Sequence, residues 1–136
     1  MNRDTLSAQL VIDEDLKLKP YRDTVGKLTI GVGRNLDDVG ISKNEAMMLL
    51  ESDIDVACMD LDKDLPWWRE MTDSRQQVLA NMCFNMGIKK LLGFVNTLAN
   101  MKSGEYVVAA NGMRNSLWAK QVGQRAERLA QMMEKG

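Results

Sequence analysis

The sequence of 136 residues contains no histidine, only two cysteines and only two prolines. The lack of histidine excludes Ser–His–Asp triads and Cys–His nucleophile pairs. Cys58 and Cys83 have no Cys-x-x-Cys spacing and leave too few ligands for a typical zinc site, so we expect two reduced, buried thiols. The chemistry that remains is that of carboxylates, hydroxyls, amides, lysine and arginine.

Long hydrophobic runs are absent as well. The apolar stretches are far shorter than the ~20 residues of a membrane-spanning helix, and the N-terminal segment lacks the apolar core of a signal peptide. We therefore expect no stable insertion into a membrane, and a protein made and folded in a cytoplasm. A hydrophobic fraction of 45% and a charged fraction of 27% are typical of a globular domain.

Charge is distributed unevenly along the chain, although the net charge is −1. Residues 45–73 carry nine acidic and two basic side chains, whereas residues 102–136 carry six basic and three acidic ones. Solvated helix faces explain most such runs. The alternative is that the basic C-terminal part steers the protein toward a polyanion, such as a bacterial wall or a nucleic acid. The acidic centre and the absence of a recognisable DNA-reading helix argue against nucleic acid.

The spacing of apolar residues predicts an α+β fold that is mostly helical. A first helix is expected from Asp4 to about Asp13, with Asp4 or Thr5 as its cap. From Lys17 to Gly33, glycines and a proline interrupt any helix while larger apolar residues alternate with smaller or polar ones. This pattern predicts a small antiparallel β-sheet near the N-terminus.

Helix start and stop signals organise the rest of the chain. Ser42 and Glu45 form a capping box that predicts a long helix reaching about Asp62. A second long helix is expected from Thr72 or Asp73 until Gly87. Shorter helices are expected near residues 94–101, 103–111 and 124–133.

These elements predict one domain over residues 1–136 with three parts. They are a β-lobe at about 15–40, a connecting helix at about 42–62 and a helical lobe at about 63–136. The eleven methionines are expected to fill gaps between helices, with a methionine-rich binding groove as the alternative.

Three functional side chains stand at the ends of the first predicted elements. Glu14 falls where the first helix ends, Asp23 lies in a turn and Thr29 in a strand between glycines. Among 19 acidic residues such a spacing arises often by chance, and ordinary surface charge explains it. The functional alternative is cleavage of a glycosidic bond, in which one carboxylic acid protonates the leaving oxygen and another carboxylate works from the opposite face.

The segment IDEDLKLKPYRDTVGKLTIGVGRN, residues 12–35, resembles the active-site region of T-even-type bacteriophage lysozymes, the muramidases of glycoside hydrolase family 24. That family carries Glu, eight residues, Asp, five residues and Thr, followed by I-G-x-G. Glu14, Asp23 and Thr29 satisfy both gaps, and residues 30–33 follow as I-G-V-G. Further resemblance to the family, covering nearly the whole chain, is found in NMCFNMG (81–87), GFVNTL (93–98) and SLWAKQVGQRAER (116–128).

The resemblance implies a role for each matched residue. Glu14 is the general acid, while Asp23 stabilises developing positive charge and holds the attacking water together with Thr29. This arrangement implies inversion at the anomeric carbon and carboxyl groups roughly 6.5–9.5 Å apart. A glutamate that donates a proton near neutral pH needs a partly desolvated site. Arg125 matches a family arginine that forms an ion pair with the catalytic glutamate.

The resemblance further implies that Asn35, Phe84 and Thr97 contact substrate. Core packing is the alternative for Phe84, and Asn35 stands where the best-known family member has an apolar residue.

One position departs from many relatives, which have histidine directly after I-G-x-G. This chain has Arg34 there, a group charged at all ordinary pH. Asp37 or Asp38 could be the partner of Arg34, and the sequence does not choose between them.

The function implied by the resemblance is that of a phage endolysin. Such a muramidase hydrolyses the β-1,4 bond between N-acetylmuramic acid and N-acetylglucosamine in bacterial peptidoglycan, and it needs no metal or cofactor. We expect a monomer that accumulates in the host cytoplasm and reaches the wall at lysis through a separate holin-type protein. An inactive peptidoglycan-binding relative and a lytic transglycosylase are the alternatives.

Overall fold

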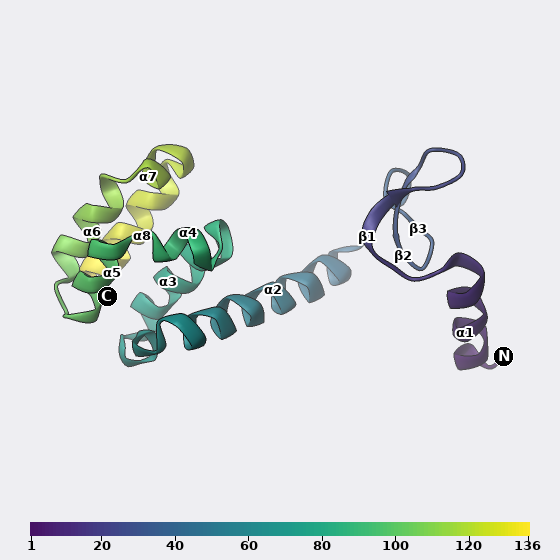
Figure 1. Ribbon diagram of the computed structural model, residues 1–136, viewed down its shortest axis with the longest axis horizontal. Coiled ribbons are helices and arrows are strands. Elements are labelled where there is room, and N and C mark those ends of the chain that lie inside the picture. Colours follow the sequence, from purple (N-terminus) through teal and green to yellow (C-terminus); the bar gives the residue numbers. More distant parts are fainter. The chain divides into compact units, whose positions relative to one another are not determined.

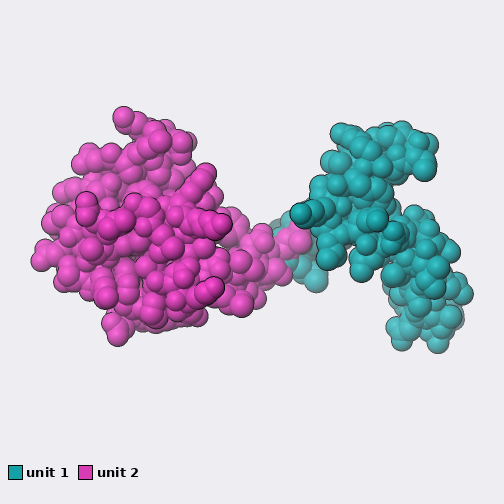
Figure 2. Space-filling view, in the orientation of Figure 1, with its two compact units in different colours: residues 1–48 teal, residues 49–136 magenta.

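The computed structural model describes all 136 residues, and the chain divides into two compact units, residues 1–48 and residues 49–136 (Figure 2). A helix and a small sheet come first, followed by one long helix and then by a series of shorter helices (Figure 1). This order confirms the predicted α+β class. None of the helices combines the length and the apolar character needed to cross a membrane.

The first unit contains one helix and three short strands. They are α1 (Arg3–Glu14), β1 (Lys17–Arg22), β2 (Leu28–Gly31) and β3 (Arg34–Asn35). The strands form an antiparallel sheet in the order β1-β2-β3, in which Tyr21 lies opposite Thr29 and Lys17 opposite Gly31. The register shifts between Lys17 and Tyr21, so the β1–β2 pairing is irregular there.

The cap of α1 differs from the prediction of Asp4 or Thr5. Asn2 holds this position, and its Oδ1 accepts a hydrogen bond from the backbone N–H of Thr5 at 3.0 Å. Asparagine caps a helix as well as aspartate or serine does, so the helix starts earlier than the apolar spacing indicated.

The capping box at the start of α2 (Lys43–Asp64) is confirmed. The backbone N–H of Glu45 donates to Ser42 Oγ at 3.1 Å, and the backbone N–H of Ser42 donates to Glu45 Oε1 at 2.9 Å. These two bonds satisfy two backbone donors that a helix start leaves without partners.

The remaining elements lie in the second unit. Helix α3 starts at Asp73, one of the two predicted start residues, and Thr72 caps it, with its hydroxyl accepting from Arg75 N at 3.3 Å. Gly87 (φ 82°) ends this helix, as predicted. Two short helices and a 3-10 turn were not predicted, because each is only about one turn long. The elements are η1 (Pro66–Glu70), α3 (Asp73–Met86), α4 (Ile88–Leu92), α5 (Val95–Lys102), α6 (Tyr106–Arg114), α7 (Leu117–Val122) and α8 (Gln124–Lys135).

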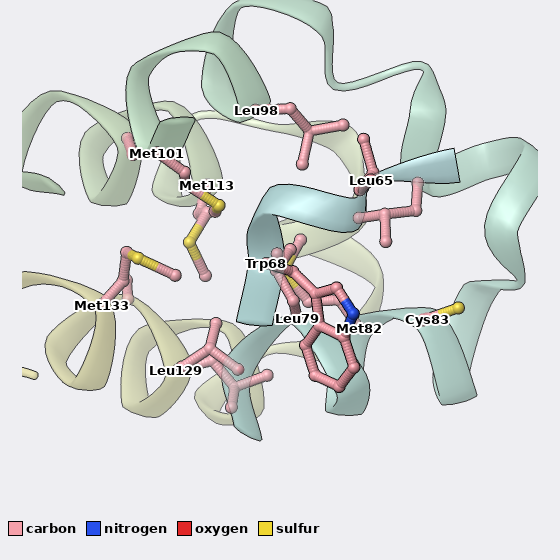
Figure 3. Packing of buried hydrophobic residues seen from close by; sticks show 14 of the residues in the cluster. Leu65, Trp68, Leu79, Met82, Cys83, Leu98, Met101, Met113, Leu129 and Met133 are labelled. Atoms are coloured by element: carbon pink, nitrogen blue, oxygen red, sulfur yellow. The ribbon is translucent and has the colours of Figure 1, made fainter. Parts of the chain in front are cut away.

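The hydrophobic core belongs to the second unit (Figure 3). Leu79 and Met82 of α3 pack with Leu129 and Met133 of α8, and all four side chains have at most 1% of their surface exposed. Methionines fill this core as predicted: Met71, Met82, Met101, Met113 and Met133 are all buried. An unbranched, flexible side chain suits the irregular gaps between short helices.

Candidate active site

Glu14 is the last residue of α1, and its carboxylate lies against the turn that follows β2. Gly33, in this turn, has φ 67°, and a Cβ built on it would stand only 2.7 Å from Glu14 Oε2. A side chain at position 33 would therefore collide with the carboxylate. The end of α1 and the turn after β2 thus lie together in the first unit, although they are separated in the sequence by the whole β1–β2 hairpin.

Asp23 occupies the loop between β1 and β2. Its Oδ1 accepts hydrogen bonds from Val25 N at 3.0 Å and from Lys27 N at 2.8 Å. Its own backbone N–H donates to the Lys27 carbonyl at 2.9 Å. Side-chain bonding to nearby backbone N–H groups is what makes aspartate favourable in turns. Within this unit the second carboxylate oxygen, Oδ2, has no donor from the chain and remains available as an acceptor.

Thr29 is the most deeply buried side chain of the first unit, with 3% of its surface exposed. Its hydroxyl donates to the Lys27 carbonyl at 2.9 Å, the same oxygen that accepts from Asp23 N. Since the hydroxyl proton is engaged, the oxygen of Thr29 can serve only as an acceptor toward a further partner.

The backbone carbonyl of Lys27 holds Asp23 and Thr29 near each other, because it accepts from both Asp23 N and Thr29 Oγ1, each at 2.9 Å. Thr29 pairs with Tyr21, and Asp23 follows Tyr21 by two residues. Asp23 comes directly after β1, which ends at Arg22, so it belongs to the loop. Asp23 Oδ2 and Thr29 Oγ1 are thus acceptors on two residues that share one backbone carbonyl. A water molecule that donates one proton to each has its lone pairs directed away from both.

The predicted partner of Arg34, Asp37 or Asp38, is wrong. Arg34 binds Glu45 at the start of α2 through two bonds, Nη2 to Oε2 at 2.8 Å and Nη1 to Oε1 at 2.9 Å. Both aspartates are engaged elsewhere: Asp37 accepts from Leu28 N at 2.8 Å, and Asp38 accepts from the Lys27 ammonium at 3.1 Å. The guanidinium matches a carboxylate with two parallel N–H donors, a geometry that sequence spacing does not reveal.

This ion pair should make stability depend on pH in the acid range. Hydrogen bonding to Arg34, then to Ser42, lowers the pKa of Glu45 from 4.5 to about 2. A carboxylate whose pKa is lowered by folding stabilises the protein above its unfolded pKa, and this stabilisation is lost as the pH falls from 4.5 toward 2. We expect Glu45→Gln to reduce the free energy of unfolding at pH 6 and to leave it unchanged near pH 2.

Denaturant unfolding at a series of pH values measures this difference. The control is Glu51→Gln, which alters an exposed glutamate of the same helix. If Glu45→Gln lowered the free energy of unfolding at pH 2 as much as at pH 6, the assigned ion pair would be contradicted.

Arg125 and Phe84 lie in the second unit. Both Nε and Nη2 of Arg125 donate to Asn81 Oδ1, at 2.9 and 2.7 Å. Phe84 is 44% exposed and, with Asn81 and Arg125, lines a largely apolar cavity of about 400 Å³ between α2 and α3. Asn81 is the first residue of the NMCFNMG motif, but the sequence did not indicate it as the partner of Arg125. The ion pair of Arg125 with Glu14 stays a prediction.

The side chains of the other two predicted substrate contacts lie against other parts of the protein. Asn35 donates from Nδ2 to Asp38 Oδ2 at 3.0 Å and accepts from Asp38 N at 2.9 Å. Thr97 is 7% exposed, and its hydroxyl lies where a Cβ on Gly112 would stand. The bonds of Asn35 hold the turn after β3, and the lack of a side chain at Gly112 allows the close approach of α5 to α6. The contacts of Asn35, Phe84 and Thr97 with substrate stay predictions.

A second cavity of the second unit, of about 570 Å³, was not predicted. Its lining includes Phe94 and Trp118, whose rings meet edge to face at a centroid distance of 6.2 Å, and Lys90. Trp118 Nε1 donates to Asn85 Oδ1 at 2.8 Å. No group of three or more His, Cys, Asp or Glu side chains is placed to hold a metal ion.

A family model described as phage lysozyme matches residues 12–134, which include every predicted site residue. The chain belongs to the phage lysozyme family. This membership supports a lysozyme-type hydrolase that acts on peptidoglycan, and it confirms the resemblance found in the sequence.

Individual relatives are similar over nearly the whole chain. Probable T4-type lysozymes 1 and 2 of Dictyostelium discoideum are 27% and 28% identical, with 97% of this chain and 95% of each relative aligned. The pre-baseplate central spike protein Gp5 of Enterobacteria phage T4 is 29% identical over 97% of this chain. The chain spans only 28% of the length of that spike protein.

Proposed function

We propose that the protein is a muramidase that hydrolyses the β-1,4 bond between N-acetylmuramic acid and N-acetylglucosamine in bacterial peptidoglycan. The observation that carries the proposal is the pair of acceptors, Asp23 Oδ2 and Thr29 Oγ1, on two residues that share the Lys27 carbonyl. Glu14, which supplies the other carboxyl group, belongs to the same unit. One proton donor and one water-binding pair are the groups that inversion at an anomeric carbon requires.

The reaction then proceeds in one displacement. Glu14, as the acid, gives its proton to the glycosidic oxygen, and the bond from this oxygen to the anomeric carbon breaks. The water held by Asp23 and Thr29 attacks the anomeric carbon from the opposite face, and Asp23 takes up the proton that the water loses. The carboxylate also stabilises the positive charge that develops on the sugar. Glu14 and Asp23 exchange protonation with solvent before the next turnover.

Product analysis tests the reaction type. Inverting hydrolysis of a β-linkage releases a reducing end as the α-anomer, which proton NMR detects before mutarotation. The β-anomer as first product would indicate a retaining mechanism, and a 1,6-anhydro sugar would indicate the transglycosylase alternative. Binding to walls without release of any sugar end would support the inactive, peptidoglycan-binding relative.

The water-binding role of Thr29 predicts different results for two substitutions. Thr29→Val keeps the shape of the buried side chain but removes the acceptor, so we expect activity to fall by about 10²-fold, within the range for loss of one positioning or acid–base contact. Thr29→Ser keeps the acceptor and should retain most activity. Rates of wall hydrolysis at matched protein concentration measure both.

The matched control for this comparison is Thr24→Val, which changes an exposed threonine of the same hairpin loop. It should leave the rate unchanged. Equal activity in Thr29→Val and the wild type would remove Thr29 from the mechanism.

We further propose that the protein serves as a phage endolysin. It would accumulate in the host cytoplasm as a monomer and reach the wall after a holin-type protein has permeabilised the membrane. The basic side chains of residues 102–136 would favour approach to an anionic wall. Lysis of producing cells only after their inner membrane is permeabilised would support this role, and spontaneous lysis on synthesis would contradict it.

A further inference from the structure

Asp15 follows Glu14 directly and has an unusual backbone conformation. It is the only non-glycine residue with a positive φ, and its angles are φ 68° and ψ 159°. This region of conformational space is essentially restricted to glycine, because a Cβ crowds the backbone there. Such strain persists only where the surrounding structure holds it, and it concentrates at functional sites.

The side chain of Asp15 supplies contacts that hold this conformation. Oδ1 accepts a hydrogen bond from Leu16 N at 2.9 Å, and Oδ2 lies 3.1 Å from the Lys17 ammonium. Hydrogen bonding to Lys17, then to Leu16 N, lowers the pKa of Asp15, so the carboxylate stays charged at neutral pH. A short acidic side chain that binds the next backbone N–H tolerates positive φ better than other side chains do.

The conformation of residue 15 determines where Glu14 lies. Helix α1 ends at Glu14, and strand β1 starts at Lys17, so Asp15 and Leu16 make the whole change of direction. Lys17 pairs with Gly31, so the chain joins the sheet, two residues after Asp15, at the end of β2 that precedes Gly33. The carboxylate of Glu14 lies against Gly33 in the structure. An ordinary backbone conformation at residue 15 would redirect α1 and move Glu14 from this place.

We propose that Asp15 is a positioning residue for Glu14, because its glycine-like backbone, held by Leu16 N and Lys17, sets the carboxylate of Glu14 against Gly33. The consequence for catalysis rests on the proposed function, whereas the position of Glu14 does not. The backbone at residue 15 matters in this account, and the carboxylate of Asp15 matters only because it holds that backbone.

Two substitutions separate this role from a general effect on stability. Asp15→Gly removes the side chain but adopts the conformation without strain, so Glu14 should stay in place and the melting temperature should stay equal or rise. Asp15→Ala removes the contacts and keeps the Cβ, so residue 15 should relax and Glu14 should move. Asp13→Asn is the control, since it removes a neighbouring charge on the helical side of Glu14.

The first measurement is the nuclear Overhauser effect between the Glu14 γ protons and the Gly33 α protons. It should be present in the wild type, Asp15→Gly and Asp13→Asn, and lost or several-fold weaker in Asp15→Ala. The second is wall hydrolysis, in which kcat of Asp15→Ala should fall at least tenfold, with KM changed less than twofold, while Asp15→Gly retains the wild-type kcat. A displacement of about 1 Å suffices for losses of this size.

The outcomes are distinguishable. An Overhauser effect that survives in Asp15→Ala, or that is lost in Asp15→Gly, overturns the positioning role whatever the activity. If Asp15→Ala does not fold, Asp15→Gly alone still tests the positioning role. This variant should keep both the Overhauser effect between Glu14 and Gly33 and the wild-type kcat, and a loss of either overturns the role. A wild type without activity would overturn the proposed muramidase, while the Overhauser comparison would still decide how Glu14 is held.

Discussion

Gly33→Ala should abolish most of the activity, lowering the rate of wall hydrolysis by at least about 10²-fold, the size of loss expected for a misplaced reacting group. The new Cβ would stand 2.7 Å from Glu14 Oε2 and 3.0 Å from its Cδ, so the carboxylate must leave its place. Residue 33 also has φ 67°, a conformation that costs a non-glycine residue roughly 1–2 kcal/mol. The variant should therefore be somewhat less stable but folded.

The control for Gly33→Ala is Gly26→Ala in the β1–β2 loop. Gly26 has φ 85°, so alanine there meets a comparable backbone penalty, but no atom lies within 4 Å of the added Cβ. We expect a similar loss of stability and nearly full activity. If both variants lost activity in proportion to their stability, the contact between Gly33 and Glu14 would have no special role. Thermal melting and initial rates below the melting transition separate the two effects.

Local signals in the sequence predicted much of the fold. The capping box of Ser42 and Glu45, the helix start at Thr72 or Asp73 and the stop at Gly87 each depend on a few neighbouring residues, and each is found in the structure. The glycines between Lys17 and Gly33 likewise predicted the small sheet. One-turn helices such as α4 and α7 were missed because five or six residues hold too little periodicity to be recognised.

Local sequence signals could not predict the contacts between segments that are far apart in the sequence. Arg34 pairs with Glu45 rather than with the nearer Asp37 or Asp38, since the turn geometry assigns each aspartate to another donor. The contact of Glu14 with Gly33 and the strained backbone of Asp15 depend on how α1 is joined to the sheet. No pattern of residue types specifies dihedral angles at one position.

In the candidate site, too, the sequence predicted some features and the structure alone revealed others. Spacing could not distinguish Glu14 and Asp23 from ordinary surface charge, and only the resemblance of residues 12–35 to a family did so. The structure adds the shared Lys27 carbonyl, which accepts from both Asp23 N and Thr29 Oγ1. That carbonyl belongs to the backbone, and no side-chain motif could have revealed it.

The most direct measurement of the central claim is the rate at which Glu14→Gln lyses purified bacterial walls beside the wild type. Glutamine keeps the size of the side chain and its place against Gly33 but cannot donate a carboxylic acid proton, and general acid catalysis contributes typically 10²–10⁴-fold. We expect the turbidity of a wall suspension to fall about 10³-fold more slowly with Glu14→Gln, at an unchanged melting temperature. Asp13→Asn, which removes the preceding charge, should lyse walls at the wild-type rate. A folded Glu14→Gln variant that clears walls as fast as the wild type would contradict the account.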